Sequence, residues 1–192
     1  KSLAFKEALS KKIGSGHLQR ALSIANRFPD FFNEFILFDS DDEWVKLIQK
    51  SHYKYHAVKT KVEAINLACS LNASLVILDI LDTDEDDVHV LRGVTKDVKI
   101  VSFEDLGNGA LFTDATINEL YPSVSEADST IFNGPKYCFF REEFINVIDI
   151  PWEVREYDIV ISFGGTDPNN LTMRVLKVLE SYEVGLNIRV VL

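Results

Sequence analysis

The stretch Ile13-Gly14-Ser15-Gly16-His17-Leu18-Gln19-Arg20 joins an apolar opening segment to a helical pattern, and the rest of the chain can be interpreted outward from it. The helix after it is predicted by an apolar face at helical spacing, formed by Leu18, Ala21, Leu22, Ile24 and Ala25. Glycines between a strand and a helix let backbone N–H groups approach an anion. His17 would stand at the helix start, where the helix dipole disfavours imidazolium and favours a neutral base or hydrogen-bonding group.

Three interpretations of this stretch compete. A dinucleotide-binding fingerprint requires a third glycine where Gln19 stands, although Asp39 follows the next predicted strand at a suitable distance. A Walker loop is excluded because no Gly-Lys-Ser/Thr follows. The remaining alternative is a plain βα turn with a solvated histidine.

The composition limits the classes of function. The chain has 192 residues with 46% hydrophobic residues, enough for one large α/β domain or for one domain and part of another. Its net charge of −10 argues against binding nucleic acid, since no basic stripe is available to neutralise phosphates. No apolar run is long enough to span a bilayer, and no signal peptide precedes the first strand. Cys69 and Cys138 lie in apolar segments and are interpreted as thiols of a cytoplasmic protein.

Short apolar strands alternate with helical patterns through the first hundred residues. The clearest buried strand is residues 75–79, a continuous apolar run that ends in Asp79. Further strands are predicted at residues 3–5, 35–38, 53–58 and 99–103, with a shorter candidate at 115–117. This alternation predicts a doubly wound parallel sheet. Residues 82–87 are acidic but lack the glycine and glutamate that a calcium loop requires. His52 and His56 are four residues apart, but they are predicted in a loop and a strand and not on one face of a helix, so no metal is expected.

A second α/β unit begins after residue 156. The strand 158–163 runs into Gly164-Gly165-Thr166-Asp167-Pro168, where Asp167 is predicted to cap a helix over 169–182. A strand over 187–192 follows. We therefore expect an N-terminal Rossmann-like domain over residues 1–150, a linker over 151–156, and the beginning of a truncated nucleotide-binding domain over 157–192.

Four blocks in this order resemble the UDP-sugar hydrolases of pseudaminic acid biosynthesis and their relatives in spore coat polysaccharide synthesis. The first block is similar to the family's Ile-Gly-x-Gly-His-x-x-Arg, with matches at Gly14, Gly16, His17 and Arg20. The second is residues 101–105, matched at Asp105, the third is residues 137–144, and the fourth is residues 163–172. The resemblance spans nearly the whole chain and implies the two-domain GT-B architecture of MurG-like enzymes.

The resemblance also implies an activity: water attacks a UDP-linked amino-deoxy sugar and releases UDP, without a cofactor. His17 would then orient or deprotonate the water. Substrate contacts would come from Gly14, Ser15, Gly16, Asp105 and Asn169, and Gly164, Gly165 and Thr166 would hold the diphosphate at a helix N-terminus. The Asp167 carboxylate would repel the phosphate there unless it is turned away. Arg20, one turn after His17, is expected at the surface.

Two departures from the family pattern keep other functions open. Residues 6–9 replace an Arg-x-Asp-Ser type segment, which leaves Glu7 as the nearest acid, and Ile80 stands where relatives often carry histidine or tyrosine. One alternative is a GT-B glycosyltransferase in which a sugar hydroxyl replaces water. The other is a non-catalytic sugar-nucleotide-binding module, fused to or associated with a nucleotidyltransferase, and the departures favour this one most.

Overall fold

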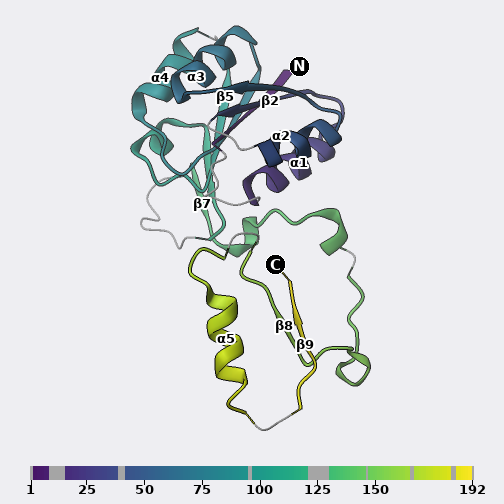
Figure 1. Ribbon diagram of the computed structural model, residues 1–192. Helices are drawn as coiled ribbons and strands as arrows, with labels where there is room; N and C mark the ends of the chain where they lie inside the picture. Colours follow the sequence, from purple (N-terminus) through teal and green to yellow (C-terminus); the bar gives the residue numbers. More distant parts are fainter. Residues whose placement is uncertain are drawn as a thin grey trace.

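The computed structural model describes residues 2–8, 16–38, 42–94, 97–120, 130–145, 147–164, 167–182 and 185–191. Within these ranges the chain forms a larger α/β unit and a smaller one, which Figure 1 shows as two separate sheets with their helices. No helix in the described ranges has both the length and the apolar character needed to cross a bilayer.

The larger unit contains seven parallel strands in the order β3-β2-β1-β4-β5-β6-β7. These are β1 (Ser2–Ala8), β2 (Phe32–Phe38), β3 (Lys54–Val58), β4 (Leu75–Asp79), β5 (Lys99–Phe103), β6 (Ala115–Asn118) and β7 (Ile131–Asn133). Four helices connect the first five strands: α1 (Gly16–Arg27), α2 (Asp42–Lys50), α3 (Lys61–Ser70) and α4 (Glu85–Val94). This is a Rossmann-like arrangement, and it confirms the predicted parallel α/β sheet.

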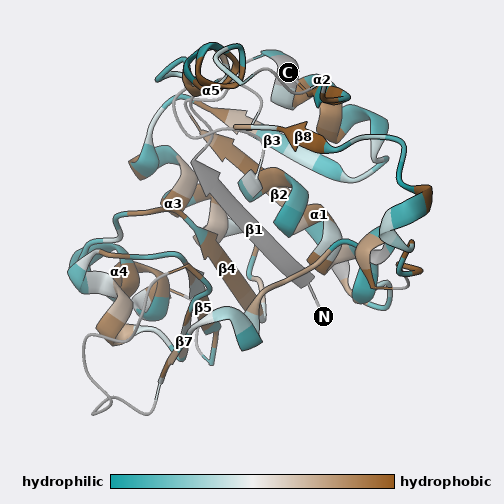
Figure 2. Ribbon diagram, turned by 90° about the horizontal axis from the view of Figure 1, so that it is seen from below, coloured by the Kyte–Doolittle hydropathy of each residue, from teal (hydrophilic) through white to brown (hydrophobic). Residues whose placement is uncertain are grey.

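Helices cover both faces of this sheet. Alternate residues of β2 point to opposite faces: Phe35 and Leu37 pack with α1 and α2, whereas Ile36 packs with α3 and α4. β4 is buried on both faces in the same way, with Ile77 in one core and Leu78 in the other, and Figure 2 shows its apolar character in brown. The continuous apolar run of this strand therefore reflects two cores, one on each side.

Local signals in the sequence set the helix boundaries. Thr60 caps α3: its side chain accepts a hydrogen bond from the N–H of Glu63, and the Glu63 carboxylate accepts one from the N–H of Thr60. The helix expected after Thr60 is confirmed. The loop after β5 is fixed by Gly107, because a Cβ there would lie only 2.3 Å from the backbone oxygen of Thr83.

After residue 105 the described chain no longer alternates between strands and α-helices. The short strand candidate near residue 115 is confirmed as β6, but β7 was not predicted. β7 has only three residues, and all of them are partly exposed. A strand this short cannot display the alternation of apolar and polar residues from which strands are predicted. The brief helix expected after Arg141 is a 3-10 helix, Glu142–Phe144.

The smaller unit is a βαβ crossover of β8 (Ile159–Ile161), α5 (Leu171–Leu179) and β9 (Ile188–Val190), with β8 and β9 parallel. The predicted linker contains a 3-10 helix, Trp152–Val154. The predicted helix cap is shifted: α5 starts two residues later than expected because Pro168 and Asn169 form a turn before it. The division into two domains remains a prediction.

Candidate functional site

His17 and Asp79 meet at the carboxyl edge of the large sheet, where the strand order reverses between β1 and β4. His17 is the second residue of α1, and Asp79 is the last residue of β4. Nδ1 of His17 lies 2.5 Å from Oδ1 of Asp79, whose side chain is only 1% exposed. Ligands of open α/β sheets bind in the crevice at such a reversal, so this pair marks the expected place for a site.

Arg20 lies on the same face of α1 as His17 and also binds Asp79. Its Nε donates to Oδ2 at 2.8 Å and its Nη2 donates to Oδ1 at 2.6 Å. The expected surface position of Arg20 is therefore wrong, since its side chain is only 12% exposed. Burial alone would lower the pKa of Arg20, but the hydrogen bond and charge of Asp79, with the charges of Glu119 and Glu104, raise it above its usual value. Arg20 is a permanent cation at this edge.

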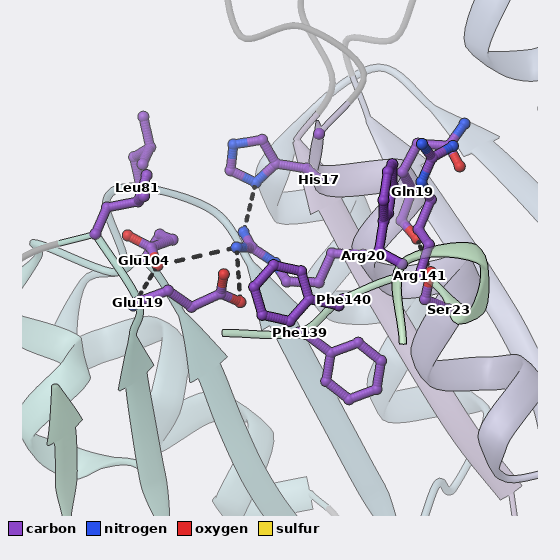
Figure 3. Close-up of a pocket in the computed structure, with 13 residues that line it drawn as sticks. His17, Gln19, Arg20, Ser23, Leu81, Glu104, Glu119, Phe139, Phe140 and Arg141 are labelled. Carbon is purple, nitrogen blue, oxygen red and sulfur yellow. Dashed lines mark hydrogen bonds and ion pairs between the residues drawn. The ribbon is translucent and has the colours of Figure 1, made fainter. Parts of the chain in front are cut away.

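Two further acids follow the next strands of the sheet. Glu104 comes directly after β5 and Glu119 directly after β6. Oε1 of Glu119 lies 3.4 Å from Nη1 of Arg20, and Oε1 of Glu104 lies 3.9 Å from the same nitrogen. The backbone N–H of Glu119 donates to Oε1 of Glu104 at 2.5 Å. Two buried carboxylates, of Asp79 and Glu104, and the partly buried carboxylate of Glu119 thus surround one guanidinium, as Figure 3 shows for the two glutamates.

A pocket of about 600 Å³ opens over these groups. Figure 3 shows Glu104 and Glu119 on one side of it, with Phe140 and Arg141 toward the other. Its polar lining comes from the sheet edge, from α1 and from Arg141. Its apolar lining comes from the loops after β4 and β6 and from the segment around residue 140. The apolar lining consists of Leu81, Leu120, Phe139, Phe140 and Phe144. Such a combination of apolar walls and a few convergent polar groups is typical of a small-molecule site.

The hydrogen-bond pattern determines the chemistry of His17. Both oxygens of Asp79 accept from Arg20, so Asp79 is the acceptor in its bond with His17. Nη2 of Arg20 also approaches Nδ1 of His17, at 3.3 Å, but the contact of Nδ1 with Asp79 is much shorter, at 2.5 Å. We therefore assign the proton to Nδ1, which leaves a lone pair on Nε2. An imidazole held in this way by a carboxylate can accept a proton from water or an alcohol. In the described part of the chain, no group of three or more His, Cys, Asp and Glu side chains is arranged to hold a metal ion.

The structure brings together some of the site residues predicted from sequence. Gly16 and His17 line the pocket, whereas Gly14 and Ser15 lie outside the described residues, as do Gly165 and Thr166. The described Gly164 and Asn169 belong to the smaller unit and are not among the residues that line the pocket.

Asp105 does not line the pocket either. Its Oδ1 accepts hydrogen bonds from the N–H groups of Thr83 and Gly107, which ties the loop after β4 to the loop after β5. Burial raises the pKa of the Asp105 carboxyl, although the hydrogen bonds from Thr83 and Gly107 act in the opposite direction. Its contacts are those of a residue that shapes the loops, and its role in substrate binding remains a prediction.

Asp167 occupies the N-terminus of α5. Its carboxylate accepts hydrogen bonds from the N–H groups of Leu171, at 2.8 Å, and Thr172, at 2.9 Å. The backbone hydrogen bond from Thr172, with that from Leu171, lowers the pKa of Asp167. An anion is therefore already present at the helix end where a diphosphate was expected.

Sequence reasoning missed Asp79, Glu104 and Glu119 as site residues. All three follow one pattern, because each is the last residue of a parallel strand or the first after it. Carboxyl ends of parallel strands share one edge, so acids at these positions could have been placed together from the sequence. Arg20 was missed because a lone arginine is usually exposed, and only the three acids explain its burial.

Comparison with models of known protein families gives no match. The chain is 31% identical over 198 residues to an uncharacterized protein of Methanocaldococcus jannaschii, with 95% of the chain and 40% of that protein covered. It is 28% identical over 192 residues to the UDP-2,4-diacetamido-2,4,6-trideoxy-beta-L-altropyranose hydrolase of Campylobacter jejuni, with 94% of the chain and 66% of the hydrolase covered. It is 23% identical over 143 residues to the spore coat polysaccharide biosynthesis protein SpsG of Bacillus subtilis, with 71% of the chain and 40% of that protein covered.

The chain thus spans 40% to 66% of the length of these relatives. Two of the three carry names from sugar-nucleotide or polysaccharide biosynthesis.

Proposed function

We propose that this chain forms the sugar-binding half of a UDP-sugar hydrolase with GT-B-like architecture. Its substrate is a UDP-linked amino-deoxy sugar used in nonulosonic acid or surface polysaccharide biosynthesis. The observation that carries the proposal is the hydrogen bond from His17 to Asp79, which leaves Nε2 of His17 as a base beside the pocket. The name of the Campylobacter relative supports the choice of substrate.

The proposed reaction needs few groups from this half of the enzyme. Nε2 of His17 takes a proton from water as the water oxygen bonds to the anomeric carbon of the sugar. The bond between that carbon and the diphosphate oxygen breaks, and UDP leaves with the electron pair. Asp79 fixes the imidazole and stabilises the imidazolium that forms, while Arg20 holds both oxygens of Asp79 by hydrogen bonds. The proposal assigns the diphosphate to the smaller unit, near Gly164 and Asn169.

The test is UDP release from UDP-amino sugars by the full-length protein. His17→Ala should lower kcat by about 10²–10⁴-fold, since that is the usual contribution of a positioned general base. His17→Gln keeps a hydrogen-bonding side chain without proton transfer, so equal losses in both variants support base catalysis. His89→Ala is the matched control, because His89 is an exposed histidine on α4, paired with Glu85.

The outcomes separate the alternatives. A His17→Ala variant that keeps most of the rate rules out His17 as the base. UDP release only when a sugar acceptor is added identifies a glycosyltransferase. Tight binding of UDP-sugars without any turnover identifies a non-catalytic binding module.

A further inference from the structure

Negative charge is in excess around Arg20, because three carboxylates lie near this one guanidinium. Asp79 is fully satisfied, because His17 and Arg20 supply donors to both of its oxygens. Oε1 of Glu104 accepts the backbone N–H of Glu119, and the only cation near Glu104 and Glu119 among the described residues is the remaining nitrogen of Arg20, at 3.9 and 3.4 Å, which is long for an ion pair. Buried carboxylates with so few donors are costly unless another group completes them.

Glu104 shows this deficit most directly. Its side chain is only 3% exposed and lines the pocket, yet its Oε2 has no hydrogen-bond partner among the described residues. Its backbone is also in the left-handed region, with φ of 52°, which is strained for a glutamate. Unpaired buried oxygens and strained backbone are both concentrated at functional sites. In Figure 3 this carboxylate lies on the same side of the pocket as Leu81 and Glu119.

The side of the pocket away from the two glutamates is apolar and carries a positive charge. Phe140 and Phe144 provide apolar surface, with half of each side chain exposed. Arg141 is the second cation of the lining, and its ion pair with the exposed Glu143 is a loose one of 3.4 Å. An anionic diphosphate would be repelled by Glu104 and Glu119 and attracted by Arg141.

We infer that Glu104 and Glu119 are specificity-determining residues that accept hydrogen bonds from the sugar of a UDP-sugar. The sugar's amide N–H or hydroxyl groups face the two carboxylates, its apolar face packs on the phenylalanines, and its diphosphate points toward Arg141. This inference rests on the proposed function. It adds the orientation of the substrate in the pocket, with the sugar at the two glutamates and the diphosphate toward Arg141. It also accounts for an acidic pocket in a protein that would bind an anionic nucleotide.

The experiment compares UDP with UDP-sugars by calorimetry on the full-length protein, using UDP-N-acetylglucosamine and UDP-glucose as probes. Glu104→Gln and Glu119→Gln should each weaken binding of the preferred UDP-sugar about 10- to 100-fold, as expected for the loss of a hydrogen bond to a charged group. Their affinity for UDP should change less than about twofold. Arg141→Ala should weaken UDP and UDP-sugar alike. Glu85→Gln, an exposed glutamate of α4, is the matched control.

A second measurement does not depend on the variants folding. A deoxy analogue of the preferred UDP-sugar, lacking one donor, should bind the unaltered protein about as weakly as the parent compound binds a Gln variant. Equal losses for UDP and UDP-sugar in the Gln variants, or no loss, would overturn the inference and leave the proposed function standing. A deoxy analogue that binds as tightly as its parent would overturn the inference in the same way. If the unaltered protein binds no UDP-sugar, the proposed function fails, and the inference fails with it.

Discussion

Arg20 and Asp79 are joined by two hydrogen bonds, of 2.8 Å and 2.6 Å, across 59 residues of sequence. The pair links the second turn of α1 to the end of β4, and His17 contacts the same carboxylate. Because one acid serves two partners, the orientation of the imidazole and the neutralisation of the buried charge depend on each other. The first two predictions concern this dependence.

Asp79→Asn should lower turnover and leave substrate affinity nearly unchanged. The amide cannot hold the imidazole in the same protonation pattern or stabilise an imidazolium, so we expect a fall in kcat of about 10²-fold or more. KM should change less than about threefold, since Asp79 is buried behind His17 and Arg20. Steady-state kinetics of the full-length protein checks this, with Asp149→Asn, an almost fully exposed acid, as the control. A variant with normal kcat would show that the orientation of His17 does not depend on Asp79.

Arg20→Ala should destabilise the fold by about 3–5 kcal/mol, because it leaves buried carboxylates without their cation. The raised pKa of Arg20 means that its contribution is fully present below the unfolded value and would be lost only at very alkaline pH. Urea unfolding at pH 7 measures the loss, and a variant as stable as the unaltered protein would show that the buried acids do not depend on this cation. Arg174→Ala, an exposed arginine of α5, should cost less than about 0.5 kcal/mol.

Asp114 gives a separate prediction on pH dependence. Burial alone would raise its pKa, but hydrogen bonds from Lys99 and from the N–H of Ile100, together with Arg92, lower it. The carboxylate therefore stabilises the fold above its unfolded pKa, and this stabilisation is lost as the pH falls through the folded value. Asp114→Asn should cost about 1–2 kcal/mol at pH 7 and less at pH 3. A cost that is equal at both pH values in urea unfolding would contradict the lowered pKa.

Gly107→Ala should destabilise the chain by about 1–3 kcal/mol, because the new methyl group would meet the backbone of Thr83. Gly93→Ala is the matched control, since a Cβ at Gly93 in α4 has nothing within 4 Å. That substitution should instead stabilise the helix by about 0.5–1 kcal/mol. Thermal unfolding of the two variants should shift in opposite directions. Shifts in the same direction would mean that the loop after β5 adjusts to the methyl group.

Asp167→Asn tests where the diphosphate lies. Asparagine keeps a side-chain oxygen to cap α5 and removes the negative charge at that helix end. If the diphosphate binds there, UDP should bind the variant more tightly than the unaltered protein, because a repulsive charge is gone. Calorimetry with UDP on full-length protein measures this, again with Asp149→Asn as the control. Unchanged affinity would place the diphosphate elsewhere.

The parallel sheet could be predicted because short apolar strands alternate with helical patterns, and because the strand at residues 75–79 is a continuous apolar run, as expected where both faces of a sheet are covered. His17 could be singled out as a candidate from its place after glycines at a helix start, and the structure places it in the lining of the pocket. The burial of Arg20 could not, since it depends on acids that are distant in sequence. β7 was missed because its three residues carry too short a pattern, although its pairing with β6 extends the sheet.

The acids after β4, β5 and β6 also bear on how such a pocket can diverge. Each stands at the end of a strand and takes no part in packing between the strands and helices of either apolar core. A single substitution at Glu104 or Glu119 changes the charge of the pocket by one unit while the sheet beneath it is retained. Related chains could therefore acquire preferences for different ligands by replacing one strand-end residue at a time.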